Sequence, residues 1–287
     1  MSLKHKLKAA IAKIGQLPII SAIIQRKSVR RLLTKIPGLG SLYPSCWDLI
    51  HPFDRFHGTD TSGVVSEKDL PKHEIARNYA IGHAGSQPSV LRSALAELPK
   101  LEDYTFVDLG CGKGRPLLVA SEFPFHDIIG VDLSSPLAQV ARRNAKIIAN
   151  RFPARTPVRV AVGDASNYPL PPGNLVIFLY HPFHAELIAN VVAGVEAALA
   201  TESRSIYVIY YNPIAGHCFD SSPQLHRHFA KMLPYADEEL GYGPDRDDPI
   251  VIWHGGIAAR ATDPSAAARI IVQHESRTQI ESLQPAF

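Results

Sequence analysis

The chain has 287 residues, of which 46% are hydrophobic and 20% are charged, enough apolar material for one large core or a core with an accessory segment. No run approaches the roughly 18 uncharged apolar residues that a membrane-spanning helix needs, and the first thirty residues lack the features of a secretory signal, so we expect a cytoplasmic protein. The three cysteines are widely spaced and fit neither a disulfide framework nor a metal site.

The net charge of +3 is unevenly distributed along the chain. Residues 1–40 hold nine Lys or Arg and no acid, which leaves 21 basic against 27 acidic residues in the remainder. In "SLKHKLKAAIAKI", Leu3, Leu7 and Ile11 recur at helical spacing between lysines, a pattern typical of a basic amphipathic helix. We predict a helical arm over 1–40. Such an arm binds an anionic membrane surface, nucleic acid or an acidic partner, or packs on the acidic body of the chain itself.

Residues 41–100 are predicted to form a cap or lid followed by a lead-in helix. The stretch from Ser41 to Ser89 is rich in turn formers and polar residues, and a long loop-rich segment in a compact domain is usually functional. The run "SVLRSALAELPKL" then shows a helical apolar face that stops at Pro99.

From residue 101 to 287, apolar strand-like runs alternate with helical ones. Near-continuous apolar strands between amphipathic helices indicate a doubly wound parallel α/β domain, covered by helices on both faces. Residues 222–233, "SPQLHRHFAKML", are predicted as one of its helices, and "ARIIVQ" in the tail as a further strand. Ligands of such sheets bind at the carboxyl ends of the strands, where the strand order reverses.

Three glycines, Gly110, Gly112 and Gly114, occupy the turn from the first strand into the first helix, in "DLGCGKGR". Missing side chains let a ligand touch the backbone and let the chain adopt positive φ. A dinucleotide site needs its third glycine one residue later, where Arg115 stands, and Lys113 lies in no phosphate-loop frame.

The motif D-x-G-x-G-x-G that begins at Asp108 resembles that of class I S-adenosylmethionine-dependent methyltransferases. "GVDLS", "VGDAS" and "FLYHPF" match further motifs of this family in chain order. The resemblance implies a Rossmann-like seven-stranded sheet with S-adenosylmethionine as cofactor. It implies that Asp132 binds both ribose hydroxyls, that Asp164 contacts the adenine amino group between Leu133 and Ala165, and that Asp108 faces the methionine end.

Simpler roles remain open for all three of these aspartates, and Asp108 could instead hold the glycine turn by accepting from its backbone N–H groups. A carboxylate suits Asp132 because its two oxygens can accept from two hydroxyls at once. Asp132 could instead help to cap the next helix, although Ser134 or Ser135 can do this without it. Asp164 could be a turn residue beside Gly163.

The segment "YHPF" follows the fourth strand, where the family places methyl transfer. Tyr180, His181 and Phe183 are therefore the predicted catalytic residues. The segment is similar to the [D/N]-P-P-[Y/F] motif of enzymes that methylate amino groups, but the histidine departs from that pattern and leaves a nitrogen acceptor open. His181 acts as a base, orients the substrate or is structural. A second polar-aromatic segment, "VIYYNP", follows the fifth strand near the same cleft.

The segment "GSQPSVLRSALAEL" is similar to the loop and helix that precede the glycine motif in non-SET lysine methyltransferases and in bacterial enzymes that share "DLGCGKGR". In those enzymes the loop closes over the cofactor. By this likeness Tyr79 and Ser86 line the carboxylate end of the cofactor.

Three functions are compatible with these motifs. The first is a methyltransferase that acts on N or O of a small molecule or of a peptide or protein side chain. The second is an RNA or DNA methyltransferase that uses the basic arm, which the acidic body and the lack of an arginine-aromatic strip disfavour. The third is a non-catalytic nucleoside-binding or scaffold protein. The arm makes peripheral membrane contact a further option, and the oligomeric state is not predicted.

Overall fold

The computed structural model describes residues 49–63, 85–180, 184–243, 245–257, 259, 269–274 and 277–281. The arm predicted over 1–40 lies outside these residues, as do Tyr79, His181 and Phe183. In the part of the chain that is described, every helix is too short or too polar to cross a membrane.

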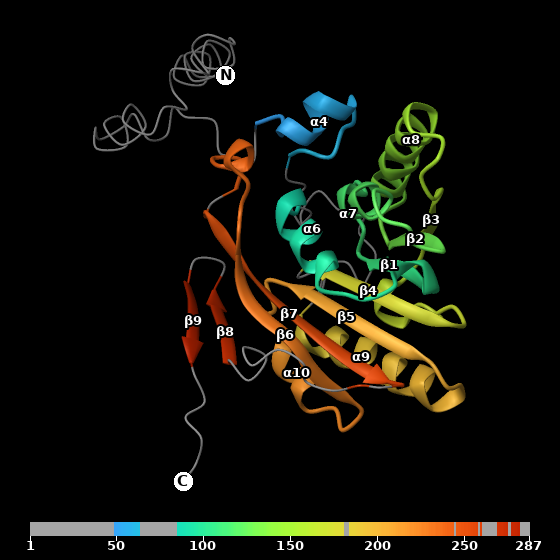
Figure 1. Cartoon of the computed structure of the whole chain (residues 1–287), viewed down its shortest axis with the longest axis vertical. Helices are drawn as coiled ribbons and strands as arrows, with labels where there is room; N and C mark the ends of the chain where they lie inside the picture. The colour runs from blue at the N-terminus through green and yellow to red at the C-terminus, as the bar shows by residue number, and fades with distance from the viewer. Residues whose placement is uncertain are drawn as a thin grey trace, which may run out of the picture.

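A seven-stranded sheet in the order β3-β2-β1-β4-β5-β7-β6 forms the centre of the fold (Figure 1). Its members are β1 (Tyr104–Leu109), β2 (Asp127–Asp132), β3 (Val158–Val162), β4 (Asn174–Tyr180), β5 (Ser205–Tyr211), β6 (Leu225–Pro234) and β7 (Asp247–Gly256). Strands β1 to β5 pair in parallel, whereas β7 is antiparallel to β5 and to β6. The predicted doubly wound, Rossmann-like sheet is confirmed, but the expectation that all its strands are parallel is wrong for β7. No helix long enough for a parallel crossover separates β6 from β7, so the two pair as a hairpin.

Helices cover both faces of the sheet, as predicted (Figure 1). One face carries α6 (Pro88–Ala96), α7 (Arg115–Ala120) and α8 (Ser135–Arg151), and the other carries α9 (Ala185–Thr201) and α10 (Gly216–Asp220). Each face has its own apolar core, in which alternate strand residues meet the helices above or below them. Phe106 and Phe178 lie in the first core, and Ile177 and Trp253 in the second.

The prediction of a helix over 222–233 is wrong, because Leu225–Pro234 forms strand β6. Leu225, Phe229 and Leu233 are buried and four residues apart, a spacing that fits one face of a helix, but in the strand Leu225 lies in the second core and Phe229 and Leu233 lie in the first. A register shift between Arg227 and Phe229 interrupts the alternation and hides the strand pattern further. The long ladder with β7 therefore overrides the local helical pattern.

Smaller elements complete the description. The stretch predicted as a loop-rich cap contains α4 (Pro52–His57), and the single-turn helices are η4 (Leu101–Asp103), η5 (Ala165–Asn167) and η6 (Asp237–Glu239). The strand predicted at "ARIIVQ" is confirmed as β8 (Arg269–His274), which pairs with β9 (Arg277–Glu281).

The strand order reverses between β1 and β4. From β1 the chain proceeds outward to β2 and β3 and then returns to the other side of β1 to form β4. In an open sheet of this kind, a crevice forms at the carboxyl ends of the strands on either side of this point. The carboxyl ends of β1, β2 and β4 are therefore where a ligand site is expected.

Candidate functional site

The turn after β1 needs glycine for conformational reasons. Gly110, Gly112 and Gly114 have φ of 90°, 52° and 87°, a region that favours glycine. A Cβ on Gly114 would also lie only 3.0 Å from the Cβ of Ala141 in α8. The amides of Gly110 and Cys111 both donate to the carbonyl of Val131, at 2.9 and 3.0 Å, so the turn is tied to the end of β2.

Asp132 fixes the same turn from the neighbouring strand. Its Oδ2 accepts from the amide of Gly112 at 2.7 Å, and its Oδ1 accepts from the amide of Ser134 at 2.8 Å. The side chain is 8% exposed, and burial raises its pKa while these two bonds oppose that rise. Because each carboxylate oxygen has a second lone pair, both can still accept from a ligand. Ser134 caps α8 with its own hydroxyl, which accepts from Leu137.

Asp108 supplies a second carboxyl group beneath the turn. It is 1% exposed, and its Oδ2 has no hydrogen-bond partner among the described residues. Burial, and then the nearby charge of Asp132, raise its pKa well above the usual value. A buried carboxyl oxygen without a partner is costly unless something donates to it. The glycine turn and these two carboxyl groups therefore fit a ligand that carries hydroxyl or ammonium donors.

The end of β3 lies next to Asp132, because the amide of Gly163 donates to the carbonyl of Asp132 at 3.0 Å. Asp164 caps η5 there: its oxygens accept from Ser166 at 2.7 and 2.9 Å and from Asn167 at 2.8 Å. Asp164 therefore has the turn role that the sequence left open. Its contact with adenine remains a prediction. Leu133 is half-buried and Ala165 is buried.

A short segment before the domain holds the helix that follows the glycine turn. Arg115 is 3% exposed and donates to the hydroxyl of Thr61 at 2.7 Å and to the carbonyl of Ser86 at 3.0 Å. Its guanidinium lies 3.7 Å from the carboxylate of Asp54, which is itself buried. Ser86 therefore lies beside the turn through its backbone, and its predicted contact with the cofactor remains a prediction.

The residue pair Lys113 and Asn144 holds the same segment. Lys113 donates to a carboxylate oxygen of Asp60 at 2.8 Å and to the carbonyl of Ser62 at 2.6 Å. The Asn144 side chain bonds the amide and the carbonyl of Asp60, both at 2.9 Å. We call residues 51–62 the clasp. No motif in the sequence pointed to a role for Lys113 or Arg115, although both hold the clasp on the glycine turn.

A cluster of tyrosines and one carboxylate lies at the ends of β4 and β5. Tyr180 pairs with Tyr211 in the ladder, and their rings meet edge to face with centroids 4.4 Å apart. The hydroxyls of Tyr211 and Tyr235 both donate to Oδ2 of Asp248, the latter at 2.5 Å. Asp248 lies two residues before Ile250, the ladder partner of Tyr211, and so extends beyond the carboxyl end of β5.

The protonation of this cluster follows from burial. Burial raises the pKa of Asp248 to about 6, against the opposing effect of the two tyrosine hydrogen bonds. Burial and the charge of Asp248 raise the pKa of Tyr211 well above its usual value, so its hydroxyl keeps its proton. No motif in the sequence pointed to Asp248, and the only nearby signal was the segment "VIYYNP". Among the described residues, no three His, Cys, Asp or Glu side chains converge as a metal site would require.

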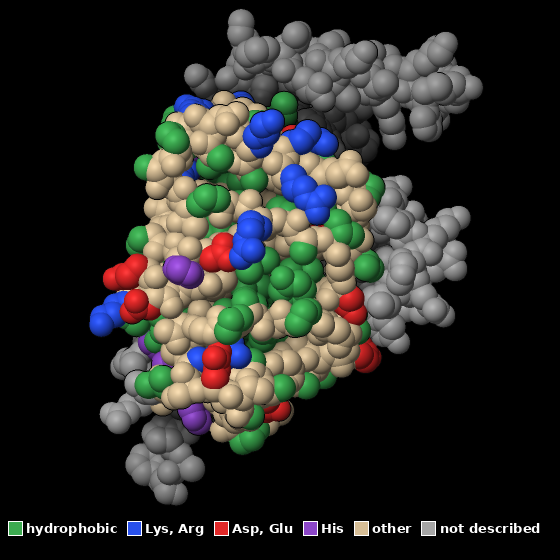
Figure 2. All heavy atoms as spheres, turned by 90° about the vertical axis from the view of Figure 1, so that its right-hand side faces the viewer, with side chains coloured by type: hydrophobic (Ala, Val, Ile, Leu, Met, Phe, Trp, Pro, Cys, Tyr) green, Lys and Arg blue, Asp and Glu red, His purple; other side chains and the backbone are tan. Residues whose placement is uncertain are grey.

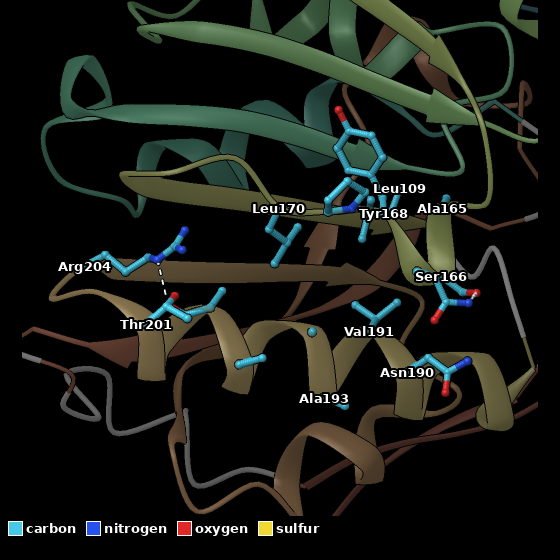
Figure 3. A pocket seen from close by; sticks show the side chains of 15 residues that line it. Leu109, Ala165, Ser166, Tyr168, Leu170, Asn190, Val191, Ala193, Thr201 and Arg204 are labelled. Atoms are coloured by element: carbon cyan, nitrogen blue, oxygen red, sulfur yellow. Dashed lines mark hydrogen bonds between the residues drawn. The ribbon is translucent and has the colours of Figure 1, made fainter.

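A separate groove of about 470 Å³ lies on the face of the sheet that α9 covers (Figure 3). Figure 3 shows Asn190 and Val191 of α9 on one side and the segment with Ala165 and Leu170 on the other. The groove exists because the connection from β3 to β4 contains only the single turn η5 where a doubly wound fold usually has a helix. Asp108, Asp132 and Tyr180 do not line it.

Comparison with known proteins bears on the central part of the chain. Residues 106–202 match a family model described as a methyltransferase domain. This range contains the glycine turn, Asp132, Asp164 and Tyr180. A search of curated proteins finds no match.

Several solved structures are similar at low identity. The YcgJ protein from Bacillus subtilis is 15% identical over 58% of this chain and 97% of its own, with a TM-score of 0.42. TrmN from Thermus thermophilus is 16% identical over 59% of this chain and 49% of its own, also with a TM-score of 0.42. An RNA methyltransferase from Salinibacter ruber, in complex with S-adenosyl-L-homocysteine, is 13% identical over 63% of this chain and all of its own, with a TM-score of 0.40.

Proposed function

Because this chain is a class I S-adenosylmethionine-dependent methyltransferase, we propose that it methylates N or O of a small molecule or of a peptide or protein side chain, at the carboxyl ends of β4 and β5. The observation that supports this most is the carboxylate of Asp248, which two tyrosine hydroxyls hold near Tyr180. A base is needed wherever the acceptor arrives with a proton, as amines and hydroxyls do.

S-adenosylmethionine is the cofactor, and it supplies a methyl group already activated on a sulfonium. On our proposal Asp132 accepts from the ribose hydroxyls, and Asp164 lies at the adenine between Leu133 and Ala165. Asp108 faces the methionine end. The remaining task of the chain is to align the acceptor and exclude water.

The glycine turn and the residues before α6 complete this proposed cofactor site. Gly110, Gly112 and Gly114 expose backbone at the turn. Ser86 lies beside the turn, because its carbonyl accepts from Arg115. Tyr79 is assigned to the same cofactor site on the basis of the sequence likeness alone. The clasp keeps the start of α7 in place below them.

The acceptor side is proposed to move a proton along side chains of this chain. The oxygen of Tyr211 takes the acceptor's proton as its own proton passes to Asp248, to which it is already hydrogen-bonded. An ammonium acceptor is then a neutral amine, a hydroxyl acceptor is then an oxyanion, and Asp248 carries the proton until solvent removes it. Tyr180 packs against the Tyr211 ring and so holds its orientation.

This proton path predicts how activity depends on pH. Since burial raises the pKa of Asp248 to about 6, kcat/KM is expected to rise as the pH increases through about 6, where the carboxylate forms. Asp248→Asn should remove that limb and lower kcat at neutral pH by roughly tenfold or more. Binding of S-adenosylhomocysteine should stay unchanged in this variant. A pH profile of Asp248→Asn that matches the wild type would contradict the proposal.

His181 and Phe183 are proposed to contact the acceptor on the basis of the sequence motif alone. His181→Ala is expected to lower turnover by roughly 100-fold, the usual contribution of a positioned acid or base, with a much smaller change in cofactor affinity. Single-turnover kinetics and calorimetry measure the two effects separately. Equal losses of turnover and of cofactor affinity would assign His181 a structural role.

The experiment that tests the acceptor class is transfer of a labelled methyl group to a cell lysate divided into small molecules, protein and RNA. The proposal expects label in the small-molecule or the protein fraction. Label in RNA alone, removed by ribonuclease, would overturn it. The Asp132→Ala variant, which is expected not to bind the cofactor, is the negative control.

A further inference from the structure

A pocket of about 440 Å³ lies between α4, α6, η6 and the turns that follow α7 and α8. No residue of the proposed cofactor and acceptor sites lines it, and its size is that of a small-molecule site. Pro52, Phe53, Phe56 and Pro88 supply its apolar lining. Phe56 is 64% exposed, more than any other large hydrophobic residue in the described part of the chain, so a ligand in the pocket would cover apolar surface that is now in water.

Two buried polar atoms on residues that line this pocket lack a partner. Nδ1 of His57 and Nη1 of Arg155 have no hydrogen-bond partner among the described residues, and His57 is only 6% exposed. The carboxylate of Glu122 lies 4.0 Å from the Arg155 guanidinium, but it already accepts from Arg92 at 2.6 and 2.9 Å. Because buried polar atoms normally form hydrogen bonds, the two nitrogens call for an acceptor that the described residues do not supply.

Helix η6 brings unpaired carboxylates to the same pocket. Glu238 and Glu239 line it, and neither has a basic group within 4 Å among the described residues. Charged side chains are usually solvated, as on the face that Figure 2 shows, where basic and acidic groups both lie at the surface. Glu239 is instead 3% exposed, and burial raises its pKa against the hydrogen bonds from the amide and the hydroxyl of Ser89. A cation in the pocket would stabilise its carboxylate.

We propose that this pocket binds a free amino acid with an apolar side chain. The carboxylate of the ligand accepts from Nη1 of Arg155 and from Nδ1 of His57, and its ammonium donates to Glu238. The side chain of the ligand lies against Phe53 and Phe56. Burial lowers the pKa of His57, so its ring is neutral at pH 7 and can carry its proton on Nδ1.

The mixed charge of the pocket favours this zwitterion over a simple ion. A simple anion would meet the carboxylates of Glu238 and Glu239, and a simple cation would leave the Arg155 guanidinium without an acceptor. A carboxylate and an ammonium on one small molecule satisfy both kinds of group through charge-assisted hydrogen bonds.

The test is isothermal calorimetry of the full chain with L-phenylalanine, in the presence of S-adenosylhomocysteine. L-phenylalaninamide lacks the carboxylate and N-acetyl-L-phenylalanine lacks the ammonium, so each should bind roughly tenfold or more weakly than L-phenylalanine. Glycine, which lacks the apolar side chain, should also bind about tenfold more weakly. Asp132→Ala and Asp248→Asn should bind L-phenylalanine as the wild type does, so the result is independent of the proposed cofactor and acceptor sites.

Variants of the pocket test which side chain recognises which group. Arg155→Gln should remove the preference for L-phenylalanine over its amide, and Glu238→Gln should remove the preference over the acetylated form. Arg143→Gln, on the exposed side of α8, and Asp237→Asn, next to Glu238 in η6, are the matched controls, because neither residue lines the pocket. Both controls should keep both preferences.

Three results would overturn the proposal. If the wild type shows no saturable binding of L-phenylalanine, water alone fills the pocket. If N-acetyl-L-phenylalanine binds as tightly as L-phenylalanine, the pocket does not recognise an ammonium. If Arg155→Gln and Glu238→Gln both keep the wild-type preferences, the amino acid binds elsewhere on the chain.

Discussion

Asp132→Ala is expected to abolish measurable binding of S-adenosylmethionine and S-adenosylhomocysteine. On our proposal the substitution removes two hydrogen bonds from a carboxylate to ribose hydroxyls, each worth about 1.5–3 kcal/mol, so that affinity falls by roughly two to four orders of magnitude. It also frees the amide of Gly112, which Asp132 holds at 2.7 Å, and so loosens the turn that the cofactor contacts. Isothermal calorimetry measures the loss directly.

Asp127→Ala is the matched control, because Asp127 lies at the opposite end of the same strand and pairs with Arg159 near the surface. It should leave cofactor affinity unchanged. Asp132→Asn, which keeps one acceptor oxygen, should bind with intermediate affinity. If Asp132→Ala binds S-adenosylhomocysteine as the wild type does, Asp132 is only a structural bond to the glycine turn and the proposed cofactor site is wrong.

Arg115→Met is expected to destabilise the fold by about 3–5 kcal/mol, because it leaves the buried carboxylate of Asp54 without its countercharge. The variant also loses the bonds from Arg115 to Thr61 and Ser86, which join the clasp and the start of α6 to the helix after the glycine turn. Urea denaturation followed by circular dichroism measures the free energy of unfolding.

Arg159→Met is the comparison for this prediction. Its pair with Asp127 is largely exposed, so the loss should not exceed about 1 kcal/mol. In Arg115→Met combined with Asp54→Asn, the orphaned charge is gone and part of the lost stability should return. Equal stability losses for Arg115→Met and Arg159→Met would show that the clasp is not held by the buried pair.

Much of the fold followed from local sequence pattern. Apolar runs of strand length and helical periodicity between them predicted the doubly wound sheet, since each signal lies within a few adjacent residues. The family and its cofactor were also expected from short motifs at the ends of successive strands, and residues 106–202 match a family model described as a methyltransferase domain. The roles of the individual site residues stay predictions.

The two wrong predictions about the fold, the helix over 222–233 and the parallel direction of β7, have a common cause. Residues 222–233 carry a spacing that both a helix and a bulged strand can produce, and only the ladder with β7 decides between them. The antiparallel direction of β7 likewise depends on which strands it meets, Tyr211 opposite Ile250 among them, and not on its own composition.

By itself, the sequence determined the alternation of strands and helices, the glycine turn and the carboxylates at the strand ends, because each of these depends on neighbouring residues. The tertiary structure alone decided that Arg115 pairs with Asp54 and that Asp248 accepts from Tyr211 and Tyr235. These partners come from distant parts of the chain, and no local periodicity links them. Burial then makes the pairing necessary, because an isolated charge in the interior costs more than the fold can supply.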